Sequence, residues 1–327
     1  MEIAVLFPGQ GAQFPGMAKD LYDHSAAVRE LFEVASDIAQ KSMTELLFEG
    51  TEDDLKQTDN TQIAITLANL AARTVLAEYG ITGTRAAGFS LGEYAAFVEV
   101  GVLTPDDAFR LVLARGAIME RVSRSLDDAD GAAGMAAAMG KDLPEIAQIL
   151  ADAKAQNPAI ADAYPALYNS PVQTVLGGRA GALTAATEAL KAGGVRRVIP
   201  LKTSGPFHTP LMQPARDEFS GIACDIEFRD PERPVYSNVT GAPVTSGEEV
   251  RAFCLDQLVK TVMWTTEERR LLDDGVELLL EVGPGTVLQG LWNAVGKSDD
   301  TWPTDRFRTA GTLEEIEALA KEIADAD

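Results

Sequence analysis

The sequence predicts an α/β protein with a largely parallel sheet, into which a small ferredoxin-like domain is inserted. The first observation is that short β-rich runs alternate with longer stretches of helical periodicity. The second is the βαββαβ order of the elements between residues 131 and 201, which is the order of a ferredoxin-like unit. The third is the return of the α/β pattern afterwards. We therefore expect a large domain of residues 1–130 and 200–327 and a small domain of residues 131–199.

The large domain is expected to begin with a buried strand, because residues 3–7 form a continuous apolar run. A helix starts at Thr104 and Pro105, since a hydroxyl caps the first turn and proline suits the first helical position. The other strands are expected at 85–87, 235–239 and 276–282, and the other helices at 26–39, 61–79, 94–100, after Gly285 and at 312–327.

The small domain is predicted from a change in residue composition and in the pattern of predicted elements near residue 131. Residues 131–139 are small and apolar, as in a strand, and two further strands surround Asn169-Ser170-Pro171 within residues 164–177. A last strand is expected at 195–201. The helices are expected at 143–154 and 183–192.

Charge and composition exclude several classes of protein. The chain has 28 Lys and Arg against 50 Asp and Glu, a net charge of −22, so binding to nucleic acid or to an anionic membrane is not expected. No apolar stretch approaches the roughly 18 residues of a membrane span, and the first residues lack a signal-peptide pattern. Two cysteines without a C-x-x-C pair indicate a reducing compartment, so we expect a cytoplasmic protein. We also expect a monomer.

A serine nucleophile is predicted at Ser90. Gly88-Phe89-Ser90-Leu91-Gly92 fits the G-x-S-x-G pattern between a predicted strand and a predicted helix. In that context the chain turns sharply, the hydroxyl projects from the sheet edge, and the amide N–H of Leu91 faces a developing oxyanion. The alternative is a tight structural turn with an incidental serine.

The chain contains only two histidines, so the base for Ser90 must be His24 or His208. His24 lies in a polar loop at a helix entry, which predicts a solvated side chain. His208 follows a predicted strand in a loop with Gly205 and Pro206, which resists regular structure and suits a rigid functional loop. We therefore assign the base to His208. Two histidines also exclude a metal site built from several of them.

Arg115 lies on the apolar stripe of the helix that begins at Pro105. A buried guanidinium needs an anion, and its planar fork suits a carboxylate. That carboxylate is either on a substrate beside Ser90 or on an internal partner such as Glu93 or Glu281. The spacing alone does not decide between them.

The loop Gly9-Gln10-Gly11 follows the first strand but is not a nucleotide-binding loop. It lacks the G-K-[ST] ending of a P-loop, and Phe14 replaces the third glycine of G-x-G-x-x-G. It lies where α/β proteins place their sites, at the carboxyl end of a strand, and is a candidate for the second oxyanion donor.

Together these segments resemble the malonyl-CoA:acyl carrier protein transacylases and the related acyltransferase domains of polyketide synthases. The resemblance covers nearly the whole chain. The motifs that carry it, in the order of that family, are Phe7-Pro8-Gly9-Gln10-Gly11, Gly88-Phe89-Ser90-Leu91-Gly92-Glu93, Ala114-Arg115-Gly116, Tyr168-Asn169-Ser170-Pro171, Phe207-His208, Ser237-Asn238-Val239, Gln257-Leu258 with Trp264, and Glu281-Val282-Gly283-Pro284-Gly285.

The resemblance implies a hydrolase-like α/β domain with a ferredoxin-like insert. It implies a ping-pong reaction, in which a malonyl group passes from malonyl-CoA through Ser90 to the phosphopantetheine thiol of acyl carrier protein, for fatty acid biosynthesis. No metal or redox cofactor is required. The implied roles are nucleophile for Ser90, base and then acid for His208, malonyl clamp for Arg115, oxyanion amides for Gln10 and Leu91, histidine-orienting carbonyl for Gln257, and substrate contacts for Asn169 and Phe207.

One position departs from the family pattern. Phe89 precedes the nucleophile where histidine is common, so packing and polarity beside the acyl pocket are expected to differ. The Phe207-His208 pair resembles malonyl-selective members more than methylmalonyl-selective ones. A stand-alone polyketide acyltransferase, a serine acyl hydrolase and a non-catalytic interaction protein on the same fold remain as alternatives.

A stretch of four cations without a carboxylate is a candidate landing site for an acidic carrier protein. It contains Lys191, Arg196, Arg197 and Lys202, and it leads towards the His208 loop. The alternative is that these cations are scattered over the exposed face of a strand.

Overall fold

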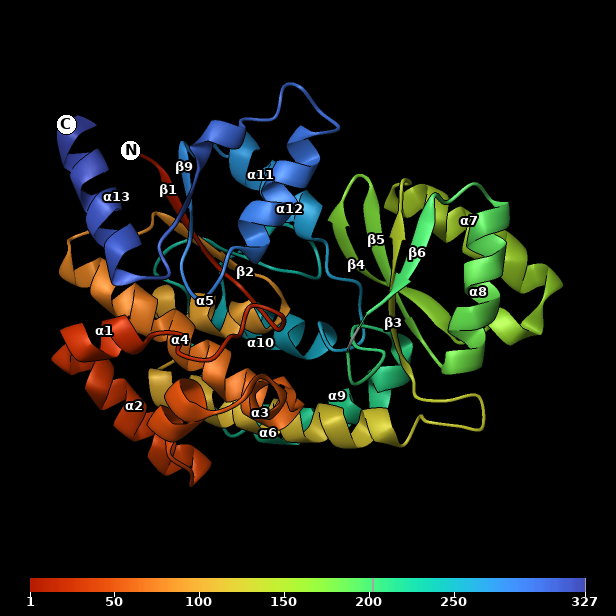
Figure 1. Ribbon diagram of the computed structural model, residues 1–327, viewed down its shortest axis with the longest axis horizontal. Coiled ribbons are helices and arrows are strands. Elements are labelled where there is room, and N and C mark those ends of the chain that lie inside the picture. The colour runs from red at the N-terminus through yellow and green to blue at the C-terminus, as the bar shows by residue number, and fades with distance from the viewer. Residues whose placement is uncertain (202, 327) are drawn as a thin grey trace.

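The computed structural model describes residues 1–201 and 203–326, and it confirms the predicted α/β fold class. Figure 1 shows an elongated molecule with a larger half, which contains both ends of the chain, and a smaller half on the right. The larger half contains a mixed, mostly parallel sheet, and the smaller half contains a separate antiparallel sheet. Lys202 of the candidate landing site and Asp327 of the last expected helix lie outside the described residues.

The large sheet has the strand order β10-β9-β1-β2-β7-β8. Its neighbours pair in parallel except for β7 and β8, which form an antiparallel pair at one edge. The carboxyl ends of β1, β2, β7 and β9 therefore meet at one edge of the sheet, which is where α/β proteins build their sites. The strands are β1 Ile3–Phe7, β2 Arg85–Gly88, β7 Val235–Tyr236, β8 Pro243–Val244, β9 Leu278–Glu281 and β10 Phe307–Thr309.

Helices cover both faces of this sheet because its central strand is apolar on both sides. Ile3, Val5 and Phe7 contribute to one buried cluster, and Ala4 and Leu6 contribute to the cluster on the opposite face. The helices of the larger half are α1 Lys19–His24, α2 Ala26–Ala39, α3 Glu52–Lys56, α4 Thr58–Glu78, α5 Glu93–Glu99, α6 Pro105–Arg124, α9 Gln213–Ala223, α10 Gly247–Asp256, α11 Trp264–Asp273, α12 Val287–Gly296 and α13 Leu313–Ala326.

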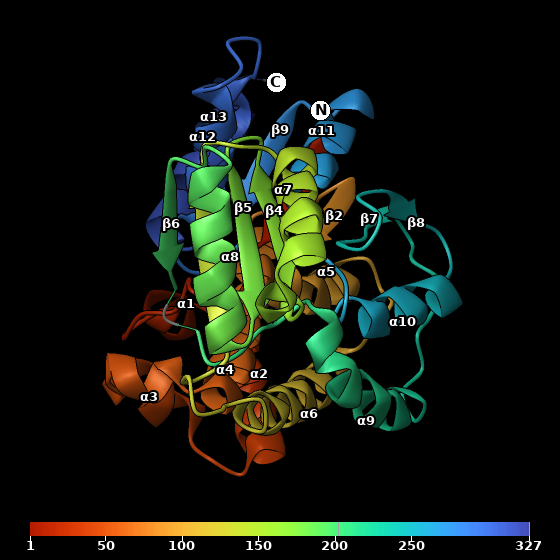
Figure 2. The same ribbon diagram turned by 90° about the vertical axis from the view of Figure 1, so that its right-hand side faces the viewer.

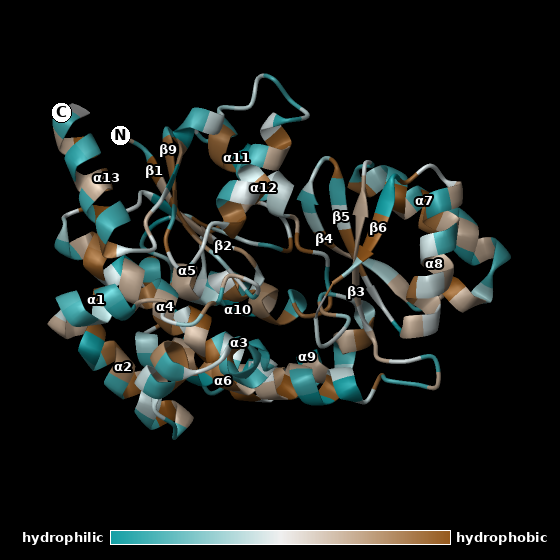
Figure 3. Ribbon diagram, viewed as in Figure 1, coloured by the Kyte–Doolittle hydropathy of each residue, from teal (hydrophilic) through white to brown (hydrophobic). Residues whose placement is uncertain are grey.

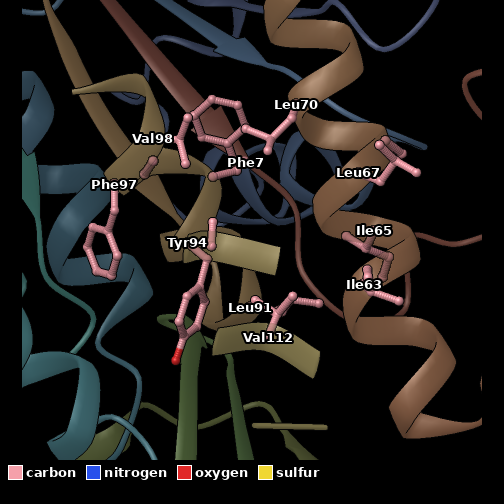
Figure 4. Packing of buried hydrophobic residues seen from close by; sticks show 14 of the residues in the cluster. Phe7, Ile63, Ile65, Leu67, Leu70, Leu91, Tyr94, Phe97, Val98 and Val112 are labelled. Atoms are coloured by element: carbon pink, nitrogen blue, oxygen red, sulfur yellow. The ribbon is translucent and has the colours of Figure 1, made fainter. Parts of the chain in front are cut away.

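The larger core lies between the sheet and helices α4, α5 and α6. Figure 4 shows Phe7 packed beside Leu70 of α4, and Leu91, Tyr94 and Ile63 belong to the same buried cluster. Helix α4 is buried over most of its length, whereas α1 and α2 present hydrophilic residues outward (Figure 3). Among the described residues, no helix is long and apolar enough to cross a membrane.

The small sheet has the order β4-β5-β3-β6, with every neighbouring pair antiparallel, as the βαββαβ sequence order predicts. Helices α7 and α8 cover one face of this sheet (Figure 2). Alternate residues such as Ala137 and Val175 face the larger half instead. The elements are β3 Gly134–Met139, α7 Leu143–Gln156, β4 Ala163–Ser170, β5 Gln173–Gly178, α8 Ala180–Ala192 and β6 Arg197–Pro200.

Several elements differ from the sequence-based expectation. The strand expected at 235–239 ends at Tyr236, because Ser237 starts a turn that leads into the short strand β8. Helix α4 begins at Thr58 instead of residue 61, and β3 begins at Gly134 instead of residue 131. Strands β8 and β10 and helices α9, α10 and α11 were not expected. The domain boundaries predicted from the sequence stay a proposal, and β6 ends one residue beyond the proposed boundary at 199.

Candidate active site

Ser90 lies in a sharp turn between β2 and α5, in the left-handed backbone region at φ +51°. The turn depends on the two glycines that flank it. A Cβ at Gly88 would lie 2.1 Å from the backbone of Gly92, and a Cβ at Gly92 would lie 2.0 Å from the carbonyl oxygen of Phe7. The strand and the following helix can therefore approach each other only where side chains are absent.

His208 is placed beside Ser90 by the loop between β6 and α9. Its Nε2 lies 2.7 Å from the Ser90 Oγ, and its Nδ1 lies 2.7 Å from the backbone carbonyl oxygen of Gln257. Because that carbonyl can only accept, Nδ1 carries the proton and Nε2 is free to accept the serine proton. Like Ser90, His208 has a positive φ, of +60°.

Burial lowers the pKa of His208 to about 3, with a further contribution from the positive charge of Arg115, and the Gln257 carbonyl partly opposes both. The imidazole is 4% exposed. It is therefore neutral at physiological pH, which is the form that a general base needs. His24, the other candidate base, is exposed at the end of α1 beside Tyr79.

Arg115 is 1% exposed and is bound by neutral groups. Its Nη1 donates to Gln62 Oε1 and its Nη2 donates to Gln257 Oε1, each at 2.9 Å. Nη2 also lies 3.5 Å from the Ser90 Oγ, and the guanidinium carbon lies 5.7 Å from the centre of the Tyr94 ring. In the described part of the chain, the Arg115 Nε has no hydrogen-bond partner.

Neither carboxylate considered as an internal partner pairs with Arg115. Glu281 accepts the backbone N–H groups of Leu288 and Gln289 at the start of α12. Glu93 is reached only through the Gln257 side chain, which donates to Glu93 and accepts from Arg115. Among the described residues, no carboxylate oxygen lies within 4.0 Å of this guanidinium. Arg115 is thus a buried cation without an anion, beside the serine hydroxyl.

The loop after β1 lies against the serine turn. An added Cβ at Gly9 would be 2.3 Å from the carbonyl oxygen of Phe89 and 3.5 Å from the amide nitrogen of Leu91. Gln10 follows at once, and Gln10 and Leu91 both line the same cavity as Ser90. The parallel pairing of β1 and β2 therefore brings the two proposed oxyanion donors to one wall.

The cavity has a volume of about 290 Å³. It lies between the serine turn and the face of the small sheet that α7 and α8 do not cover. Asn169 and Phe207 line it, as do Met135, Ala137, Val175 and other apolar residues. Asn169 donates to Gln173, and in the described structure its own Oδ1 is buried without a partner. The cavity thus combines a mostly apolar wall with a few polar groups near Ser90, which is typical of a small-molecule site.

Phe89, which departs from the family pattern, is 7% exposed and lines this cavity. Its ring packs edge to face on Trp264, with ring centres 5.3 Å apart. The side chain is therefore fixed by aromatic packing and adds apolar surface beside the nucleophile.

Sequence reasoning missed two neutral side chains of the site. Gln62 binds Arg115 from α4, and Asn238 accepts the backbone N–H of Ser90 at 2.6 Å. Asn238 carried two usable signals, because it lies in the motif Ser237-Asn238-Val239 and is a polar residue just after a strand of the parallel sheet. Gln62 carried none beyond being a polar residue on an apolar helix.

A serine turn, a neutral histidine and two candidate oxyanion amides define the class of protein as a serine-dependent acyl-transferring enzyme. The family model described as the acyl transferase domain matches residues 5–317, so the chain belongs to the acyl transferase family and is an acyltransferase.

The relatives are similar over almost their full length. The malonyl CoA-acyl carrier protein transacylase of Bacillus subtilis is 36% identical over 90% of this chain and 91% of its own. The crystal structure of MCAT from Streptococcus pneumoniae has a TM-score of 0.88 at 32% identity, covering 98% of this chain and 100% of the other. A type II PKS acyl-carrier protein in complex with its malonyl-transacylase matches with a TM-score of 0.87 at 32% identity, covering 98% and 100%. The family resemblance read from the motifs is confirmed.

Proposed function

We propose that this acyltransferase moves a malonyl group from malonyl-CoA to the phosphopantetheine thiol of an acyl carrier protein through a malonyl ester on Ser90. The observation that carries the proposal is the unpaired Arg115 cation, 3.5 Å from the Ser90 Oγ in a cavity with mostly apolar walls. A carboxylate on the acyl group would supply the missing anion, and a malonyl group carries one at the end opposite its thioester.

The first half-reaction forms the ester. The Ser90 oxygen attacks the thioester carbonyl carbon while His208 Nε2 takes the hydroxyl proton. The negative charge that develops on the carbonyl oxygen is stabilised by the backbone N–H groups of Gln10 and Leu91. When the carbon–sulfur bond breaks, the coenzyme A sulfur leaves and takes the proton from His208. The Gln257 carbonyl keeps the imidazolium oriented and stabilised through Nδ1.

The second half-reaction runs the same steps in reverse with another thiol. His208 removes the proton of the carrier-protein thiol, the sulfur attacks the ester carbon, and Ser90 leaves with the proton. Asn169 and Phe207 contact the substrate from the cavity wall. Every proton and electron pair is carried by these groups, so the proposed reaction requires no metal or redox cofactor.

The proposal is tested by the intact mass of the protein after mixing with malonyl-CoA. The wild type is expected to gain one malonyl group on the peptide that contains Ser90, and to lose it when a carrier protein with a phosphopantetheine thiol is added. The Ser90→Ala variant is the control and should stay unmodified. An unchanged wild-type mass, or an adduct on Ser90→Ala, would contradict the proposal.

The fate of the ester distinguishes two alternative functions. A serine acyl hydrolase would share Ser90 and His208 but would release malonate without an acceptor thiol. A stand-alone polyketide acyltransferase is suggested by the type II PKS complex among the similar structures. We assign the product to fatty acid biosynthesis. Transfer to fatty acid and polyketide carrier proteins in competition decides between the two pathways.

We propose that the carrier protein docks along β6, the edge strand of the small sheet. Lys191 at the end of α8, Arg196 just before β6 and Arg197 on it are exposed. In the described part of the chain, no carboxylate lies within 4.0 Å of their charged groups. Two large apolar side chains, Ile199 and Leu201, are also exposed on this strip. Because Leu201 also lines the cavity, the strip leads from a basic surface to Ser90, although the whole chain is acidic.

Reversal of two charges on this strip should slow transfer to the carrier protein. We expect Arg196→Glu with Arg197→Glu to lower kcat/KM for the carrier protein about 10-fold at low salt, and less at 0.5 M salt, because steering is screened. Transfer to free pantetheine should not change. The control, Arg110→Glu with Lys321→Glu, alters the net charge equally on exposed helix positions of the larger half. Equal losses for both acceptors, or for both double variants, would contradict the docking site.

We also propose a cytoplasmic location and a monomeric state. Cys224 and Cys254 are both free thiols, which fits a reducing compartment.

A further inference from the structure

Asn238 lies two residues after the end of β7 and binds the backbone on both sides of Phe89. Its Oδ1 accepts the N–H of Ser90 at 2.6 Å, and its Nδ2 donates to the carbonyl oxygen of Gly88 at 2.7 Å. The side-chain amide thus links the chain beyond the end of β7 to the last residue of β2 and to the serine turn. Its contacts with the turn are made by the side chain alone, so the residue type at position 238 matters.

The serine turn needs such support because its backbone is strained. A residue other than glycine in the left-handed region costs about 1 kcal/mol or more, and Ser90 has φ +51°. Asn238 holds the amide before this residue, and the Gln257 side chain donates to the Ser90 carbonyl at 2.9 Å. Both peptide groups that flank the nucleophile are therefore fixed by buried side-chain amides.

Asn238 is itself fixed from two helices. Its backbone N–H donates to Glu93 Oε1 of α5 at 2.7 Å, and its Nδ2 also donates to Glu267 Oε1 of α11 at 2.8 Å. Its own carbonyl accepts the N–H of Met263 at 2.8 Å. Asn238 and Glu267 are 0% exposed and Glu93 is 1% exposed. The amide therefore has one orientation, with its oxygen towards Ser90 and its NH2 group towards Gly88.

We propose that Asn238 is a positioning residue for the acyl transfer, which holds Ser90 in the left-handed conformation that directs the hydroxyl at His208. The inference rests on the proposed nucleophilic role of Ser90. The N–H of Ser90 is hydrogen-bonded to Asn238. The N–H of Leu91 is therefore the group of the serine turn that can bind the oxyanion. Asn238 contributes to the rate through backbone geometry and makes no contact with the malonyl group.

The first test is the rate at which the malonyl-enzyme forms, followed by rapid quench and intact mass. Asn238→Ala should acylate about 100-fold more slowly than wild type, because a displacement near 1 Å costs about that factor. Binding of malonyl-CoA, measured in a Ser90→Ala background, should change less than threefold. The matched control is Ser237→Ala, which removes a buried hydroxyl from the adjacent residue and leaves the contacts of Ser90 unchanged.

The second test is the pH profile of Asn238→Asp, which distinguishes positioning from a general structural role. A protonated Asp keeps the acceptor for Ser90 and one donor for Gly88, and it loses only the second donor, which Asn238 uses for Glu267. An ionised Asp cannot donate to Gly88 at all. The titratable and charged groups around position 238 are Glu93 from α5, Glu267 from α11 and Arg115, which is reached through Gln257. Burial raises the pKa of Glu93 to about 8 and the pKa of Glu267 well above its usual range. The same burial should raise the pKa of the new carboxyl, so that it becomes protonated as the pH falls.

The activity of Asn238→Asp relative to wild type should therefore rise at least 10-fold between pH 8.5 and pH 5.5. The ratio to wild type removes the titration of His208 from the comparison. A ratio that is constant with pH, or an Asn238→Ala rate within threefold of wild type, would overturn the inference. If Asn238→Ala does not fold, the Asp profile decides. Failure of the wild type to form a malonyl ester would overturn the proposed function instead.

Discussion

Replacement of Arg115 by Ala is expected to lower kcat/KM for malonyl-CoA about 10³-fold without lowering kcat/KM for acetyl-CoA. Loss of one partner of a buried charge pair costs about 3–5 kcal/mol, which corresponds to a factor of this size. The acetyl group has no carboxylate, so its transfer does not depend on the pair. Competition between the two thioesters, read by the intact mass of the acyl-enzyme, measures the ratio directly.

The companion variant is Arg115→Lys, which keeps the charge but loses the planar fork. It should recover part of the preference for malonyl, because a single ammonium can still pair with a carboxylate. It should not recover all of it, since Arg115 is oriented by hydrogen bonds to both Gln62 and Gln257. Equal losses for malonyl and acetyl transfer in Arg115→Ala would show that this arginine only supports the fold.

The Arg115 charge also links the choice of substrate to the strength of the base. After burial, this charge is the main reason that the pKa of His208 is low. In the proposed reaction, a malonyl carboxylate bound to Arg115 would neutralise the charge and raise the basicity of His208 when Ser90 must lose its proton. An acetyl group gives no such compensation. On this proposal, selectivity for malonyl would come from acid–base chemistry as well as from binding.

The sequence predicted the residues that are chemically unusual. With two histidines, the base for Ser90 followed by elimination, and an arginine on an apolar helix stripe required an anion. The structure places His208, Arg115 and Gln257 around Ser90 and places Gln10, Leu91, Asn169 and Phe207 on the cavity, while their roles in the reaction stay proposals. Periodicity could not decide between a substrate and an internal partner for Arg115, because that choice depends on contacts between distant segments.

The neutral amides could not be predicted for a related reason. Asn238 lies in one of the family motifs, but neither Gln62 nor Asn238 can be given a role until the chain folds, since their partners are 53 and 148 residues away along the sequence. The fold was predictable where periodicity was strong, as in β1 and in the βαββαβ segment. It was less predictable between residues 213 and 273, where the two strands have two residues each and helix boundaries depend on packing.

Replacement of His208 by Ala is expected to slow formation of the malonyl-enzyme about 10⁴-fold, which is the upper range for loss of a general base. The chain offers no substitute, because the other histidine, His24, is exposed on α1. Rapid-quench intact mass gives the rate. Residual acylation should remain measurable, because the nearby Arg115 cation favours loss of the Ser90 proton to water. A loss below 10-fold would show that another group takes the serine proton.

The same variant also separates two effects of pH. The folded His208 has a pKa of about 3 against 6.5 in an unfolded chain, so protons bind preferentially to the unfolded state between these values. Wild type should therefore lose about 2 kcal/mol of stability between pH 8 and pH 5 that His208→Ala does not lose. Urea unfolding of both proteins at the two pH values measures this difference. Because the base is still neutral at pH 5, wild-type acylation should show no acid limb from His208 there. A parallel loss of stability in both proteins would contradict the low pKa, and with it the view that Arg115 and burial keep this histidine ready to accept a proton.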